Sequence, residues 1–236
     1  MMIIHLISSP RNVSTALMYS FAQRRDTIVM DEPFYAYYLK NCQIEHPGMD
    51  HIIEKCESDP DKIIQNILKY KNSKKILFIK NMAHHIADLD IDFMVDMKNI
   101  FFIRNPLQLI TSFAKVIANP GLADIGIKTI YQIYSQSKDG SSVVLDSGEL
   151  LKDPHGVLGK LCNDCKIPFD ESMISWPAGP KPYDGIWAEY WYENVHKSTS
   201  FAKQRATDRT LSDKYLSLYE SALPFYNELF KHSIKA

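Results

Sequence analysis

Short apolar runs alternate with helical patterns along this chain, and that alternation limits the fold more than any other feature. The apolar runs are bounded by polar or turn residues and predict strands at Ile3–Ile7, Thr27–Met30, Lys75–Ile79, Asn99–Ile103 and Ser142–Leu145. Each run is nearly continuous in apolar character, which is typical of parallel strands covered on both faces.

Helical patterns follow several of these runs. Ser14–Arg24 begins with a residue type that caps helices, whereas Pro60–Tyr70 and Pro106–Ala118 begin with proline, which is favoured in the first helical turn. Leu211–Phe230 is amphipathic, and we expect Pro224 to break it. Repeated strand-then-helix units predict an α/β fold in three layers, with a mostly parallel central sheet of about five strands flanked by helices.

Composition narrows the class of protein. With 236 residues, of which 45% are hydrophobic, the chain can bury one substantial core, so we predict a single domain over residues 1–236. Lys and Arg total 27 against 28 Asp and Glu, which argues against a nucleic-acid partner because such a partner requires clustered basic residues. No apolar run approaches the roughly 18–20 residues that span a bilayer, and Met1–Ile7 is too short for a signal core. We therefore expect a cytoplasmic protein without membrane association, and the sequence does not indicate an oligomeric state.

The cysteines fit the same compartment. Cys42 and Cys56 stand alone, and Cys162 and Cys165 form one C-x-x-C with no second ligand pair nearby. We expect the C-x-x-C pair to be two reduced thiols on one helix, and we expect no bound metal.

The first predicted strand leads through Ser8–Thr15 directly into a helix. In a parallel sheet, ligands gather beyond the carboxyl ends of the strands. The start of a helix favours an anion, and here Arg11 adds a bidentate charge while Ser14 and Thr15 add hydroxyl donors. The alternative is an ordinary β–α turn with Ser14 as N-cap and Arg11 in solvent. The chain has no G-x-x-x-x-G-K-[ST] motif and its first glycine is Gly48, which disfavours an ordinary ATPase or GTPase.

Pro10–Leu17, with the sequence P-R-N-V-S-T-A-L, resembles the phosphosulfate loop of the sulfotransferase family, whose usual pattern is P-[KR]-[ST]-G-[ST]-T. The resemblance implies a P-loop NTPase-like sulfotransferase fold that binds 3′-phosphoadenosine 5′-phosphosulfate as co-substrate. It assigns the 5′ end of that nucleotide to Arg11, Asn12, Ser14 and Thr15. The family's usual glycine is Val13 here, and a β-branched residue tolerates positive φ poorly. We therefore expect a differently shaped loop, or a position that does not need that conformation.

A second family element is a strand that ends in arginine, with a serine eight residues later, and it holds the 3′-phosphate. The segment Phe101–Pro106 contains Arg104, and Ser112 follows at that spacing. The resemblance therefore implies that Arg104 and Ser112 bind the 3′-phosphate. Spacing alone leaves open whether Ser112 faces the same ligand as Arg104.

Three further segments resemble a subgroup of sulfotransferase-like domains, some of which are fused to aminotransferase-like domains in plants. They are D-E-P-F-Y-A-Y-Y-L at Asp31–Leu39, K-N-M-A-H-H at Lys80–His85 and G-P-K-P-Y-D-G-I-W-A-E-Y-W-Y at Gly179–Tyr192. With these segments, the resemblance extends from residue 3 to about residue 201.

The resemblance also implies residues for the chemistry. Sugar sulfotransferases often carry a catalytic carboxylate after the second strand, which implies Glu32 as the base, the alternative being an N-cap or a salt bridge to Arg11. Small-molecule sulfotransferases carry a lysine and then a histidine at the end of the third strand. That pattern implies Lys80 for charge on the bridging oxygen, with His84 or His85 as base or acceptor-binding residue. Here the first histidine follows the lysine by four residues rather than two, so the match is positional.

The segment Trp176–Tyr192 contains all three tryptophans. We expect Trp191 to belong to an aromatic core stripe, while a proline-rich loop with exposed aromatic rings closes over adenine or an acceptor. Because sulfotransferases supply further cations from a late loop, the resemblance makes Lys181 and Lys197 candidates for a nucleotide phosphate, whereas Arg205 and Arg209 are expected in solvent.

Together these features predict a sulfotransferase-like enzyme that moves a sulfuryl group from 3′-phosphoadenosine 5′-phosphosulfate to a hydroxyl or amine of a small-molecule acceptor. Two alternatives stay open. A nucleotide or metabolite kinase is disfavoured by the missing lysine motif and by the lack of an evident Mg²⁺ ligand pair. A non-catalytic nucleotide-binding module is favoured by Val13.

Overall fold

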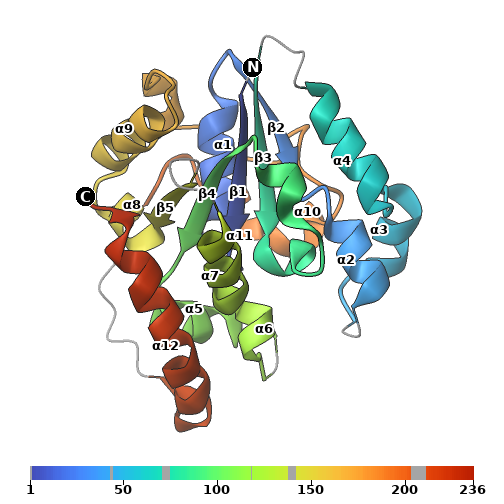
Figure 1. Ribbon diagram of the computed structural model, residues 1–236, viewed down its shortest axis with the longest axis vertical. Coiled ribbons are helices and arrows are strands. Elements are labelled where there is room, and N and C mark those ends of the chain that lie inside the picture. Colours follow the sequence, from blue (N-terminus) through green and yellow to red (C-terminus); the bar gives the residue numbers. More distant parts are fainter. Residues whose placement is uncertain (1, 43–44, 71–74, 118, 138–141, 203–210) are drawn as a thin grey trace.

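The computed structural model describes residues 2–42, 45–70, 75–117, 119–137, 142–202 and 211–236 (Figure 1). Within these residues, parallel strands form one six-stranded sheet in the order β2–β3–β1–β4–β5–β6. The strands are β1 (Ile3–Ser8), β2 (Thr27–Asp31), β3 (Ile76–Met82), β4 (Lys98–Ile103), β5 (Ser142–Asp146) and β6 (Ser233–Ile234).

Helices cover both faces of the sheet (Figure 1). They are α1 (Ser14–Ala22), α2 (Tyr35–Asn41), α3 (Met49–Lys55), α4 (Pro60–Lys69), α5 (Pro106–Phe113), α6 (Leu122–Ile125), α7 (Ile127–Gln136), α8 (Ser147–Lys152), α9 (Pro154–Asp164), α10 (Ala188–Trp191), α11 (Glu193–His196) and α12 (Leu216–Lys231). Short 3₁₀ turns lie at η2 (Ala83–Ile86), η3 (Ile91–Met94), η4 (Glu171–Ile174) and η5 (Asp213–Tyr215).

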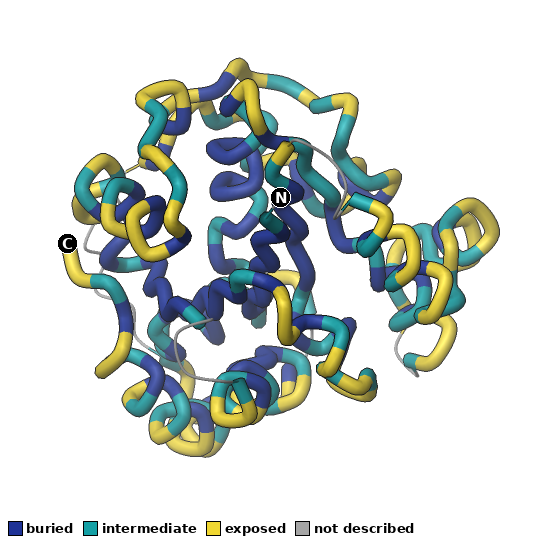
Figure 2. Tube along the Cα trace, turned by 45° about the horizontal axis from the view of Figure 1, so that its top comes forward, coloured by how far each residue is buried: buried dark blue, intermediate teal, exposed yellow. Residues whose placement is uncertain are grey.

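Two apolar cores explain this layering. On one face, Leu17 of α1 and Leu158 of α9 pack with Phe78 of β3. On the other face, Ile130 of α7 and Leu229 of α12 belong to the second core. Figure 2 shows the result, with buried strands in the interior and exposed residues along the outer sides of the helices. The predicted three-layer α/β fold is therefore confirmed.

The five predicted strands are all present, and β6 adds a sixth at the edge beside β5. The prediction that Pro224 breaks the last helix was wrong, because α12 runs through it. A proline removes the N–H that would bond to the carbonyl four residues earlier. That carbonyl belongs to the exposed Glu220, where solvent replaces the missing donor.

The C-x-x-C thiols lie in the interior. Cys162 lies in α9 and Cys165 caps its end, and both are free and buried. Burial raises the pKa of Cys162 to about 11 and that of Cys165 to about 12. Among the described residues, no group of three His, Cys, Asp or Glu side chains is arranged to hold a metal ion.

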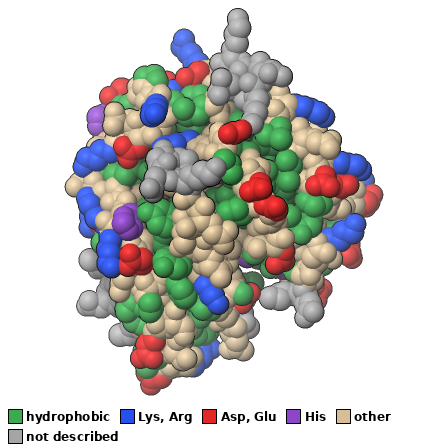
Figure 3. All heavy atoms as spheres, viewed as in Figure 1, with side chains coloured by type: hydrophobic (Ala, Val, Ile, Leu, Met, Phe, Trp, Pro, Cys, Tyr) green, Lys and Arg blue, Asp and Glu red, His purple; other side chains and the backbone are tan. Residues whose placement is uncertain are grey.

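Two surface properties bear on partners. The face drawn in Figure 3 carries acidic and basic side chains interspersed, as the near-zero net charge suggests. None of the helices in the described part of the chain is both long enough and apolar enough to cross a membrane.

Candidate active site

The loop after β1 is held in an unusual backbone conformation. Arg11 has φ of 56° and Val13 has φ of 48° with ψ of 21°, so both residues are left-handed. The expectation that Val13 would change the shape of the loop was wrong, since the valine adopts the conformation in which a glycine is usual. Such strain persists only where the surroundings impose it, and it gathers at functional sites.

Strand β4 imposes that conformation. The side-chain amide of Asn12 donates to the carbonyl of Phe102, and the Arg104 guanidinium donates to the carbonyl of Arg11. The backbone N–H of Ser9 also donates to Phe102 at 3.4 Å. Three hydrogen bonds thus connect the loop to Phe102 and Arg104 at the end of β4. These bonds offset the conformational cost of a left-handed valine.

The strain at Val13 is measurable. A Cβ in the left-handed region costs roughly 1–2 kcal/mol, and glycine avoids that cost. We therefore expect Val13→Gly to have a larger free energy of unfolding than Val13→Ala by about 1 kcal/mol, measured by urea denaturation. The exposed helical position Ser221 is the control, since there alanine should be the more stable by a similar amount. The same order of stability at both positions would contradict a strained loop.

Helix α1 opens directly onto this loop. Val13 is the N-cap and makes no side-chain capping bond among the described residues, so the alternative of an ordinary turn was wrong to place Ser14 as N-cap. Ser14 is instead the first helical residue, and it lies beside Thr15 on the wall of a cavity. The first N–H groups of a helix lack partners within it and attract anions.

The two predicted anion elements meet. The Arg11 side chain donates from Nε to Oγ of Ser112 at 3.4 Å, so Ser112, two turns into α5, does face the loop. Arg104 is buried at the end of β4. Arg11 is partly buried, and this burial lowers its pKa from the usual value. Two guanidinium groups therefore line one cavity, beside the start of α1.

This cavity has a volume of about 370 Å³. Its lining includes nine residues that the sequence assigned to the site, which are Arg11, Asn12, Ser14, Thr15, Glu32, His84, His85, Arg104 and Ser112. Apolar side chains also line the cavity. They are Phe113, Val116 and Ile117 from α5 and the turn after it, and Val195 and Phe201 from the late segment.

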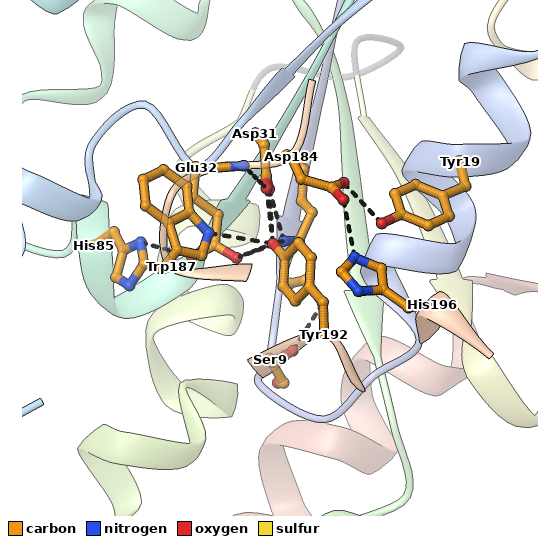
Figure 4. Close-up of polar contacts among 12 residues, drawn as sticks. Ser9, Tyr19, Asp31, Glu32, His85, Asp184, Trp187, Tyr192 and His196 are labelled. Atoms are coloured by element: carbon orange, nitrogen blue, oxygen red, sulfur yellow. Dashed lines mark hydrogen bonds and ion pairs between the residues drawn. The ribbon is translucent and has the colours of Figure 1, made fainter. Parts of the chain in front are cut away.

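Glu32 on the cavity wall belongs to a buried charge cluster (Figure 4). The Lys80 ammonium is fully buried; it bonds to Asp31 at 2.9 Å and also to Glu32. Burial opposes the charge on Lys80, but the two carboxylates outweigh it and raise its pKa. Burial also raises the pKa of Asp31. The charge of Lys80 opposes this rise, and the charge of Glu32 adds to it. Lys80 of β3 thus compensates two consecutive carboxylates at the end of the neighbouring strand β2.

Tyr192 ties this cluster to the late segment. Its hydroxyl lies 2.8 Å from Asp31, 3.2 Å from Glu32 and 2.6 Å from Lys80 Nζ. The Trp187 indole N–H also donates to it at 3.3 Å. Burial and the neighbouring carboxylates raise the pKa of Tyr192 well above its usual value, so the hydroxyl stays protonated.

A second carboxylate anchors the same segment. Asp184 accepts from the Tyr19 hydroxyl at 2.7 Å and lies 2.9 Å from Nε2 of His196 (Figure 4). The backbone N–H of Gly185 donates to Asp31 at 3.0 Å. The proline-rich segment is therefore fastened to α1 through Asp184 and to β2 through Gly185, and Tyr192, seven residues after Gly185, also bonds to Asp31 of β2.

Comparison with known proteins places this geometry in a family. The sequence model described as the sulfotransferase domain matches residues 1–233. The chain belongs to the sulfotransferase domain family. Two curated Arabidopsis thaliana proteins, branched-chain-amino-acid aminotransferase-like proteins 1 and 2, are similar to it, at 40% and 39% identity over 233 and 235 residues. Each alignment covers 98% of this chain but 42% of the relative, so the chain spans about two fifths of the length of those proteins.

Solved structures show the same fold. The sulfotransferase domain of the Synechococcus PCC 7002 olefin synthase is 18% identical, with a TM-score of 0.58 and 93% of each chain covered. The sulfotransferase domain from the curacin biosynthetic pathway is 17% identical, with a TM-score of 0.57 and 97% of each chain covered. The predicted sulfotransferase fold and the predicted resemblance to the plant aminotransferase-like subgroup are thus both confirmed.

The structure of this sulfotransferase domain corrects the placement of two predicted site residues. Neither Lys80 nor Lys181 is among the described residues that line the cavity. Lys80 is fully buried, and its ammonium bonds to Asp31, Glu32 and the hydroxyl of Tyr192. The Lys181 ammonium bonds to the carbonyls of Pro177 and Gly179, where it braces its own loop.

Three other expectations have different outcomes. Glu32 pairs with Lys80, not with Arg11 as the alternative proposed. Trp191 is half-buried and packs against the apolar cluster that contains Trp187, as expected, and it also lies on the cavity wall. Arg205 and Arg209 lie outside the described residues.

Sequence reasoning did not assign the residues opposite Glu32. Tyr35, His46 and Tyr192 line the cavity, and none of them stood in a recognised nucleotide motif. The signal that could have identified two of them was the sequence resemblance, since Tyr35 and Tyr192 both lie within segments that resemble the plant subgroup.

Proposed function

We propose that this domain binds 3′-phosphoadenosine 5′-phosphosulfate and transfers its sulfuryl group to a hydroxyl or amine of a small-molecule acceptor. The observation that carries this proposal is the meeting of Arg11, Arg104 and Ser112 at the open start of α1, in a cavity that also contains Glu32. Anions at two separate points of one nucleotide suit two guanidinium groups beside a helix start.

The residues present fit this donor. Arg11, Asn12, Ser14 and Thr15 would hold the phosphosulfate end, and Arg104 with Ser112 would hold the 3′-phosphate. The apolar wall of Phe113, Val195 and Phe201 suits a flat heterocycle. The bound donor supplies an electrophilic sulfur joined to a good leaving group.

Glu32 is the proposed base. It is 6% exposed and lines the cavity, and its Oε1 accepts from Lys80 and Tyr192. Its Oε2 lies 3.6 Å from Nδ1 of His85. In the transfer, the acceptor oxygen or nitrogen bonds to sulfur while its proton passes to Glu32, and the bond from sulfur to the 5′-phosphate oxygen breaks. Lys80 and Tyr192 hold the carboxylate in place during this step, which is positioning catalysis.

Nucleotide binding is the direct test of the donor site. We expect 3′-phosphoadenosine 5′-phosphate to raise the melting temperature by several degrees, since a ligand at 100 times its Kd adds about 2.7 kcal/mol of stability. ATP with Mg²⁺ should not do so. Arg104→Ala should abolish the shift, whereas the exposed Arg25→Ala should keep it.

Each other outcome has a distinct meaning. A shift with ATP and Mg²⁺ alone would favour a kinase. The absence of a shift with the adenosine bisphosphate, unchanged by Arg104→Ala, would overturn the proposed donor site.

A further inference from the structure

Beyond Glu32, the cavity ends in a set of rings that the donor does not need. We call Tyr35, His46, His84, His85 and Trp191 the aromatic box; all five line the cavity. Tyr35 and His85 are buried. The other three rings are half-buried.

The rings of the aromatic box fix one another. Tyr35 stacks on His85 with centroids 4.7 Å apart and planes at 12°, and His84 stands edge-on to His85 at 4.5 Å and 89°. The Tyr35 hydroxyl is 2.9 Å from Nδ1 of His46. Outside the box, Tyr38 contacts both His84 and His85 at 4.9 Å. The ring contacts therefore give the aromatic box a defined shape before a ligand binds.

The three imidazoles are neutral at physiological pH. Burial lowers the pKa of both His84 and His85 well below the usual value. The neighbouring His85 lowers the pKa of His84 further, and the charge of Lys80 lowers that of His85 further. Burial also lowers the pKa of His46, against the opposing influence of Asp124 and Glu32. These rings therefore present apolar faces rather than cations.

The charged groups that act on the box are mainly acidic. Glu32 lies beside His85, and Asp124 of α6 acts on His46 and on Tyr38. The nearby cation Lys80 is closed off by its pairs with Asp31 and Glu32. An anionic group in the box would meet these carboxylates with no exposed cation from Lys80 to offset them.

We propose that the aromatic box holds an acceptor without negative charge whose hydroxyl is attached to, or one carbon from, an aromatic ring. This inference rests on the proposed function, because it names the acceptor for that same site. Offset and edge-to-face ring pairs add about 0.5–1.5 kcal/mol beyond area burial, so a planar ring gains more here than a saturated one. A phenol, with a pKa of about 10, also gives up its proton to a carboxylate more readily than an alkyl alcohol does.

Two matched pairs of acceptors test this assignment on protein saturated with 3′-phosphoadenosine 5′-phosphate. One pair, 4-ethylphenol and 4-ethylcyclohexanol, differs in the ring. The other, methyl 4-hydroxybenzoate and 4-hydroxybenzoate, differs in charge. Titration calorimetry should show the phenol binding at least tenfold tighter than the cyclohexanol, and the ester at least tenfold tighter than the acid. Equal affinities within either pair would overturn the assignment.

Variants locate the binding. Trp191→Leu and His84→Leu should each weaken 4-ethylphenol severalfold, while the neighbouring exposed Tyr190→Leu should not. The melting shift with the nucleotide is measured on the same samples and should persist in all three. A lost nucleotide shift in the unsubstituted protein counts against the proposed function. A retained shift without ring or charge preference counts against the aromatic box alone.

Discussion

Glu32→Gln should lower kcat for sulfuryl transfer by about 10²–10⁴-fold, the usual contribution of a general base, and leave nucleotide affinity unchanged. The amide keeps the size of the side chain, and its oxygen still accepts from Lys80 and Tyr192. What changes is the second atom, which becomes an N–H donor beside His85 instead of a carboxylate oxygen. The variant therefore loses the proton acceptor and keeps the arrangement of the cluster.

The measurement is single-turnover transfer to a phenol acceptor, with nucleotide Kd determined in parallel. The exposed Glu171, which pairs with His155 at 3.0 Å, provides the control Glu171→Gln, with unchanged kcat. A loss of nucleotide affinity in Glu32→Gln would indicate a structural role for Glu32. Full activity of Glu32→Gln would exclude it as the base.

Much of the fold followed from the sequence because parallel strands buried on both faces leave a strong pattern. The runs at β1, β3 and β4 are nearly unbroken in apolar residues, and each was predicted within three residues of its bounds. Strand β6 was missed because two residues at a sheet edge carry no periodicity. The prediction that Pro224 ends the last helix was wrong because a proline is tolerated within a helix where solvent reaches the unpaired carbonyl, and a sequence pattern does not show that exposure.

The loop after β1, which forms the proposed donor half of the site, was predictable for a related reason. A short loop between a strand and a helix fixes where Arg11 and Ser14 lie, and parallel pairing brings the end of β4 beside it. The proposed acceptor half depends on a segment more than a hundred residues farther along the chain. Tyr192 reaches Lys80 across 112 positions of sequence, and no local signal specifies such a contact. Lys80 and Lys181 were misplaced because spacing does not reveal which partners a cation has.

Lys80→Met should lower the free energy of unfolding by about 3–5 kcal/mol, the usual cost of removing one partner from a buried ion pair. Methionine fills nearly the same volume but leaves Asp31 and Glu32 buried together without their cation. At this chain length, each kcal/mol corresponds to about 2–4 °C in melting temperature. The control is Lys231→Met, because the exposed Lys231–Glu228 pair should contribute less than about 1 kcal/mol.

The deficit of Lys80→Met should also depend on pH. Burial and the charge of Glu32 raise the pKa of Asp31 in the folded state, and Lys80 opposes them, so loss of the lysine should raise that pKa further. A carboxyl whose pKa is raised by folding binds its proton more tightly in the folded state, so stability is lost as pH rises through that window. The deficit against the unsubstituted protein should therefore be larger at pH 8 than at pH 5, as measured by urea denaturation at both values. A deficit independent of pH would mean that lost packing, rather than uncompensated charge, causes the destabilisation.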